Sequence, residues 1–185
     1  GNMSKTGIFM ANGCEEIEGL TVVDILRRAD LEIDMISLNE TTSVTGSHQI
    51  TFLADTVFED VNFDAYDAIV LPGGMPGTLH LGEHEGVRLV LQKFAREGKL
   101  IAAICAAPSV LGAAELLKNK KATCHPGFES KLTGAAFSED AVVRDGNIIT
   151  SRGMGTAIDF ALAIAKYFKG DAAVADLKQK LVYLH

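Results

Sequence analysis

Residues 99–111 of the chain are KLIAAICAAPSVL, and they carry its most informative pattern. Five apolar residues, 100–104, suit a buried strand and run directly into Cys105. Pro108 follows three residues later and suits the first turn of a helix, where its missing N–H would lack an intrahelical partner anyway. The pattern predicts a strand, a turn at the cysteine and a helix, which is the arrangement of a nucleophile elbow.

Such an elbow would give Cys105 a chemical role. Open α/β sheets bind ligands at the carboxyl ends of their strands. The N-terminus of the following helix also presents N–H groups and partial positive charge, which favour a thiolate over a thiol. The alternative is a small apolar cysteine packed into the core, a common fate of free cysteine. The residues around Cys105 leave both interpretations open.

The whole chain favours one α/β domain. Its 185 residues, of which 48% are hydrophobic and 18 are glycines, are enough for one core and few for two. Strand patterns alternate with helix patterns, and no linker or repeat divides them. We expect a three-layer α/β/α sandwich with a mostly parallel sheet. Gly1 and Asn2, ahead of Met3, are expected to be a tag remnant, which leaves residues 3–185 as the domain.

The expected elements follow hydrophobic periodicity and turn signals. Strands are expected at residues 6–11, 31–38, 66–71, 100–104, 121–125, 141–144 and 148–151, with 49–54 in a small antiparallel element. Helices are expected at residues 16–29, 83–97, 108–117, 155–168 and 171–181.

Charge and cysteine usage exclude several classes of partner. A formal net charge of −7 argues against nucleic acid or an anionic membrane. No apolar run is long enough to span a bilayer, and no signal-peptide pattern opens the chain. Three cysteines without close spacing suggest neither a disulfide framework nor a zinc site, so we expect a reducing, cytoplasmic setting.

A second strand end carries a cluster of acids. Glu15 and Glu16 fall where a helix begins, and acids there complement its dipole. Glu18 lies one turn further on, beside an apolar series of the same helix. If Glu18 faces inward, burial would raise its pKa and let it donate a hydrogen bond or a proton. A solvated helix carboxylate is the alternative.

Two further strand ends carry suggestive residues. Gly73 and Gly74 would let backbone N–H groups approach a ligand and stabilise a developing oxyanion, although a plain turn also uses glycines. His125 could act as a base beside the cysteine, although a histidine at a strand end is often merely hydrogen-bonded. His80 and His84 have a spacing that can share a metal, but Gly82 interrupts their helix, and no metal site is expected.

Five segments together resemble the ThiJ/PfpI superfamily, closest to the branch of the Parkinson-associated protein deglycase and YajL. They are EEIE (15–18), VLPGG (70–74), IAAICAAP (101–108), HP (125–126) and TSRGMGT (150–156). The resemblance covers about residues 5–182. It implies a flavodoxin-like sandwich, a homodimer and a functional cysteine.

The resemblance also implies the roles of individual residues. Cys105 would be a low-pKa nucleophile that is hydrogen-bonded by a protonated Glu18. The backbone N–H groups of Gly74 and Ala106 would be the oxyanion donors, and His125 matches a nearby family histidine. No cofactor or metal is implied.

Other matched positions concern the pocket and the dimer. Gly73 belongs to the pocket, and Asp24 and Arg28 match residues near the dimer interface, beside the partner's site. Two departures limit the transfer. Ala106 stands where the protease-like branch has histidine, which disfavours a peptidase. Met154 stands where the deglycase branch usually has proline, which alters the expected shape of the pocket.

Two functions follow from the same thiolate pocket. In the first, Cys105 attacks a 2-oxoaldehyde such as methylglyoxal, Glu18 shuttles protons, and hydrolysis releases a hydroxy acid without a cofactor. Early glycation adducts would be alternative substrates. In the second, peroxide converts Cys105 to a sulfinic acid, and the protein is a redox sensor or redox-dependent chaperone. The sequence does not separate the two functions.

Overall fold

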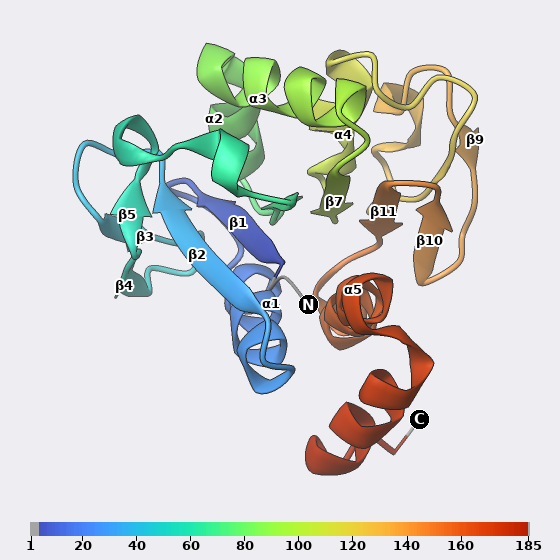
Figure 1. The fold of residues 1–185 in the computed structure, drawn as a ribbon. Helices are drawn as coiled ribbons and strands as arrows, with labels where there is room; N and C mark the ends of the chain where they lie inside the picture. Colours follow the sequence, from blue (N-terminus) through green and yellow to red (C-terminus); the bar gives the residue numbers. More distant parts are fainter. Residues whose placement is uncertain (1–3, 185) are drawn as a thin grey trace.

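A seven-stranded sheet lies between two layers of helices in the computed structural model, which describes residues 4–184 (Figure 1). The strand order is β10-β11-β7-β6-β1-β2-β5, and only the pairing of β10 with β11 is antiparallel among these described strands. The expectation of a three-layer, mostly parallel α/β sandwich is confirmed. The expected tag remnant, Gly1 and Asn2, lies outside the described residues.

The elements have the following bounds. The main sheet contains β1 (Lys5–Met10), β2 (Glu32–Ser37), β5 (Thr56–Val57), β6 (Ala68–Leu71), β7 (Leu100–Ile104), β10 (Val142–Asp145) and β11 (Ile148–Ser151). Two small sheets pair β3 (Ser43–Thr45) with β4 (Thr51–Leu53), and β8 (Lys121–Ala122) with β9 (Ala136–Phe137). The α-helices are α1 (Glu16–Arg28), α2 (Gly77–Glu83), α3 (Glu85–Arg96), α4 (Pro108–Ala113) and α5 (Ala157–Lys180). Short 3₁₀ turns cover Phe58–Asp60, Phe63–Ala65, Glu129–Lys131 and Met154–Thr156.

Alternation along the central strands builds a core on each face of the sheet. Ile8 and Met10 of β1 pack with α1 and α5, whereas Phe9 packs with α2, α3 and α4 on the other face. All three side chains are fully buried. Burial of a side chain of this size contributes about 1.5–3 kcal/mol, so both helix layers are held by the hydrophobic effect.

Three predicted elements differ from the structure. The helix expected at 83–97 corresponds to α3, which begins at Glu85 because the His84 ring Nδ1 accepts from the N–H of Val87 at 3.1 Å, and α2 at 77–83 is an additional helix that was not expected. The helix expected at 108–117 ends at Ala113. The strand expected at 121–125 shortens to β8, because the N–H of Thr123 turns to the Thr150 hydroxyl, 2.9 Å away.

The end of the chain follows its prediction closely. The expected boundary between the two closing helices falls at Gly170, whose φ of 84° interrupts α5. A left-handed φ of this kind favours glycine. Within residues 4–184, no helix combines the length and the apolar character that crossing a membrane requires.

Candidate active site

Cys105 stands on a strained turn at the carboxyl end of β7. Its φ of 68° is unusual for a residue with a side chain, and such a conformation costs about 1–3 kcal/mol. Two backbone hydrogen bonds hold it: the Cys105 N–H donates to the Ser151 carbonyl at 3.0 Å, and the His125 N–H donates to the Cys105 carbonyl at 2.8 Å. The predicted elbow is therefore present, and it leaves the thiol partly exposed.

The carboxyl group of Glu18 lies against this sulfur. Glu18 projects from the first turn of α1, is 1% exposed and shares a hydrogen bond with the Cys105 thiol. Its Oε1 also accepts from the Gly73 N–H at 3.0 Å. Burial, helped by the charge of Glu15, raises the pKa of Glu18 to about 7. A carboxyl with this pKa can give or take a proton near neutral pH.

Two backbone N–H groups point at the same sulfur. The N–H groups of Gly74 and Ala106 both hydrogen-bond Cys105. The glycines beside them are needed for space: a Cβ on Gly73 would lie 2.6 Å from Cys105 Cβ and 2.7 Å from Glu18 Oε1. Gly74 has a φ of 90°, which favours glycine as well. The pair has the form of an oxyanion hole.

The thiol of Cys105 departs from the expectation of a low pKa. Burial, followed by the negative charge of Glu18, raises the pKa of Cys105 to about 12, although the N–H groups of Ala106 and Gly74 lower it. Desolvation therefore outweighs the helix and its donors. In the resting pair the proton is on sulfur and Glu18 titrates near neutrality. Glu18 is the carboxyl that is hydrogen-bonded to this thiol.

His125 contributes its backbone rather than its ring to the elbow. The imidazole Nδ1 lies 3.0 Å from the Pro126 carbonyl, and the ring packs edge-on against Phe128. A Cβ on Gly153 would lie 3.5 Å from the ring, so the loop that carries Met154 borders it. Met154 is 53% exposed.

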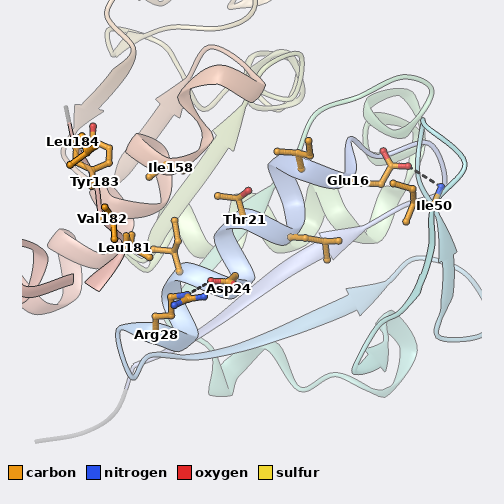
Figure 2. A pocket seen from close by; sticks show the side chains of 13 residues that line it. Glu16, Thr21, Asp24, Arg28, Ile50, Ile158, Leu181, Val182, Tyr183 and Leu184 are labelled. Atoms are coloured by element: carbon orange, nitrogen blue, oxygen red, sulfur yellow. Dashed lines mark hydrogen bonds and ion pairs between the residues drawn. The ribbon is translucent and has the colours of Figure 1, made fainter. Parts of the chain in front are cut away.

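Asp24 and Arg28 lie away from the sulfur, on the outer face of α1. They form an ion pair of 2.5 Å and line a groove of about 620 Å³ (Figure 2). Figure 2 shows the groove running from Glu16 and Ile50 along α1 to the end of the chain. The groove is separate from Cys105, which is not among its lining residues.

The described residues bring one set of possible metal donors together: Glu15, Glu16 and His48, whose donor atoms lie within 4.8 Å. Each carboxylate already has a structural role. Glu15 accepts from the Glu18 N–H at 2.9 Å and caps α1. Glu16 accepts from the backbone N–H groups of His48 and Ile50 at 2.9 and 3.1 Å. The set is thus explained by the anchoring of the 46–50 turn on the helix.

The histidines weighed as a metal pair have other partners. His80 Nδ1 lies 2.7 Å from the Asn12 carbonyl, and His84 caps α3. Sequence reasoning missed the supporting contacts of the site, such as the 2.8 Å hydrogen bond from the Glu15 N–H to the Gly73 carbonyl. These backbone contacts join distant segments and leave no residue signature.

A strained cysteine elbow beside a buried acid, in a flavodoxin-like sandwich, defines a class of α/β proteins with a cysteine at the carboxyl end of a sheet strand. Residues 4–167 match the model of the DJ-1/PfpI family, and the chain belongs to this family. The crystal structure of Drosophila melanogaster DJ-1beta superposes with a TM-score of 0.94 at 36% identity and covers 100% of both chains.

Two relatives extend this comparison. Protein DJ-1 homolog B of Arabidopsis thaliana is 40% identical over 162 residues, which are 87% of this chain but only 37% of that protein. A Caenorhabditis elegans relative is 34% identical over 169 residues, covering 90% of this chain and 89% of that protein. It is named glutathione-independent glyoxalase DJR-1.2.

Proposed function

We propose that this protein is a cofactor-free enzyme that converts 2-oxoaldehydes, or their early glycation adducts, to hydroxy acids. One observation carries the proposal: a carboxyl with a pKa of about 7, on Glu18, is hydrogen-bonded to the Cys105 thiol beneath two N–H donors. The glyoxalase name of the C. elegans relative supports the same chemistry.

The first step joins sulfur to the aldehyde carbon. The Glu18 carboxylate takes the thiol proton as Cys105 Sγ attacks, and the N–H groups of Gly74 and Ala106 hold the oxyanion that forms. Return of the proton from Glu18 to this oxygen gives a neutral hemithioacetal. A buried Glu18 with a pKa near neutrality suits both transfers.

The second step moves a proton between the two carbons. Glu18 removes the proton from the sulfur-bearing carbon and delivers it to the neighbouring carbonyl carbon, through an enediol, while the hydroxyl proton passes to the oxygen of that neighbouring carbon. The product is a thioester on Cys105 that carries a hydroxyl on the next carbon. Water cleaves the thioester, releases the hydroxy acid and restores the thiol. The net reaction adds one water to the 2-oxoaldehyde, with no change in the protein.

Purified protein supplied with methylglyoxal tests this proposal by the release of lactate. Wild-type turnover is expected, with losses of at least about 100-fold in Cys105→Ser and Glu18→Gln, because each removes a group in direct contact with the reacting atoms. Lactate formation by either variant at the wild-type rate, or none by the wild type, would refute it.

A second candidate function is redox sensing. Cys105 is partly exposed whereas Cys14 and Cys124 are buried, so peroxide reaches Cys105 first. The same N–H donors and Glu18 would hold a sulfinate. A gain of two oxygens on Cys105 under mild peroxide, in a protein that shows no turnover, would favour this function.

Three free cysteines also support a reducing, cytoplasmic setting.

We further propose that the α1 groove is the contact between two copies of this chain. Apolar side chains line it while half exposed or more: Ile17 is 50% and Leu184 is 85% exposed. A twofold axis would let the Asp24 of each copy face the Arg28 of the other. In sedimentation, Ile17→Glu should give a monomer. Leu89→Glu, at a 53% exposed position on α3, should not change the oligomeric state.

A further inference from the structure

Glu15 touches both halves of the active site without reaching the sulfur. Its backbone N–H donates to the Gly73 carbonyl at 2.8 Å. Its carboxylate Oε2 accepts from the N–H of Glu18 at 2.9 Å. We propose that Glu15 is a positioning residue that fixes both the Gly74 donor and the backbone of Glu18. The inference rests on the proposed function for its effect on turnover, but not for its effect on the thiol.

The backbone contact acts through the planarity of a peptide unit. The Gly73 carbonyl and the Gly74 N–H belong to one planar trans peptide and point in opposite directions. Holding the carbonyl from behind therefore aims the N–H at Cys105. The second donor is supported in the same way, because the His125 N–H holds the carbonyl of the Cys105–Ala106 peptide at 2.8 Å.

Close packing strengthens this contact. A Cβ on Gly74 would lie 2.3 Å from the Glu15 nitrogen and 2.8 Å from the Cys14 carbonyl carbon. The turn at Gly74 therefore packs closely against the backbone of residues 14–15, which restricts movement of the Gly73–Gly74 peptide. Loss of the Glu15 N–H would leave the Gly73 carbonyl without this donor in a confined place, which favours a shift of the whole turn.

The carboxylate of Glu15 adds an electrostatic effect. Its negative charge raises the pKa of Glu18, second to burial among the causes that raise it. The other ionisable groups facing Glu15 are Glu16 on α1, His48 of the 46–50 turn, 3.4 Å away, and the thiol of Cys14. Glu15 thus helps keep Glu18 able to hold a proton near neutral pH.

Three substitutions separate these contributions. Glu15→Gln keeps the N–H and a capping oxygen but removes the charge. Glu15→Ala keeps only the N–H. Glu15→Pro removes the N–H at a position whose φ of −76° suits proline. The readouts are lactate formation from methylglyoxal and the rate of iodoacetamide alkylation against pH. Alkylation reports on Cys105, since Cys14 and Cys124 are 1% and 0% exposed.

Glu15→Pro should turn over at least about tenfold more slowly than Glu15→Ala, because an oxyanion donor is displaced. Its rate of alkylation at a fixed pH should fall below that of Glu15→Ala, because the thiolate loses that donor. Glu15→Gln should move the acid limb of the alkylation profile to lower pH than in the wild type, by a few tenths of a unit. The reason is that the lost negative charge no longer raises the pKa of Glu18. Alkylation needs no substrate, so these shifts are measurable even if the proposed reaction is wrong.

Equal turnover and equal alkylation profiles in Glu15→Pro and Glu15→Ala would overturn the backbone role. An unshifted profile in Glu15→Gln would overturn the electrostatic role. If Glu15→Pro does not fold, hydrogen exchange of the wild type decides. The Glu15 amide should exchange as slowly as those of β1, and exchange at the rate of an exposed loop would contradict the proposal.

Discussion

Glu16 and Glu18 stand two positions apart on α1, both buried, and the pKa values of their carboxyl groups are displaced in opposite directions. Burial dominates at Glu18 and raises its pKa to about 7. Burial also acts on Glu16, but hydrogen bonds from backbone N–H groups and from His48 outweigh it and lower the pKa. The number of hydrogen-bond donors to each carboxyl, rather than its burial alone, decides whether its pKa is raised or lowered. The pKa of Glu18 is raised, whereas Glu16 stays ionised and holds the 46–50 turn.

Glu18 should make the protein less stable as pH rises. Its pKa is raised on folding, so its stabilising contribution is complete below about pH 4.5 and is lost as pH rises through about 7. The loss amounts to roughly 3 kcal/mol. Denaturant unfolding at pH 5 and pH 8 should show this decline in the wild type and little of it in Glu18→Gln. Parallel declines in both proteins would exclude Glu18 as the cause.

Glu16 should behave in the opposite way. Its pKa is lowered on folding, so its contribution is present at neutral pH and is lost as pH falls below its ordinary value. Glu16→Gln should cost about 1–3 kcal/mol at pH 7, because charge-assisted hydrogen bonds weaken. Hydrogen exchange at the His48 and Ile50 amides should accelerate in this variant. Unchanged protection would show that the turn is held by other contacts.

Gly73→Ala should lower turnover by about 100-fold. The new methyl group would lie under 3 Å from both Cys105 Cβ and Glu18 Oε1, which forces the pair apart. A displacement of this kind costs about 100-fold in rate. Gly155→Ala is the matched control, because its Cβ would meet no atom within 4 Å. The rate of lactate formation is measured for both variants. Equal rates in Gly73→Ala and Gly155→Ala would show that the reaction does not take place at Cys105 and Glu18.

His125→Ala should keep turnover within a few-fold of wild type. The ring is bound to the Pro126 carbonyl, and the contact with the elbow uses the backbone N–H, which alanine retains. A histidine acting as the catalytic base would instead be worth about 10²–10⁴ in rate. The initial rate of lactate formation distinguishes the two. A loss in the larger range would assign the chemistry to the imidazole.

The elbow could be predicted because its signals are local. The apolar run before Cys105, the proline after it and the glycines at 73–74 each constrain their own neighbourhood. The break at Gly170 was predictable for the same reason. The helix α2 at 77–83 was missed, because Gly77 and Gly82 weaken its helical pattern.

The electrostatics of the site were harder to predict. Sequence supplies the helix that favours a Cys105 thiolate, but the opposing desolvation depends on how the pocket closes around the sulfur. The sequence likewise gives no sign of two backbone hydrogen bonds. They run from the Glu15 N–H to the Gly73 carbonyl and from the His125 N–H to the Cys105 carbonyl. They use main-chain atoms, which every residue except proline provides.

The reactive centre is assembled from the β1–α1, β6–α2 and β7–α4 turns together with Ser151 at the end of β11. A growing chain that has not yet made β11 lacks the acceptor that holds the cysteine in its left-handed conformation. The Cys105 site should therefore form late in biosynthesis, when β11 pairs with β7.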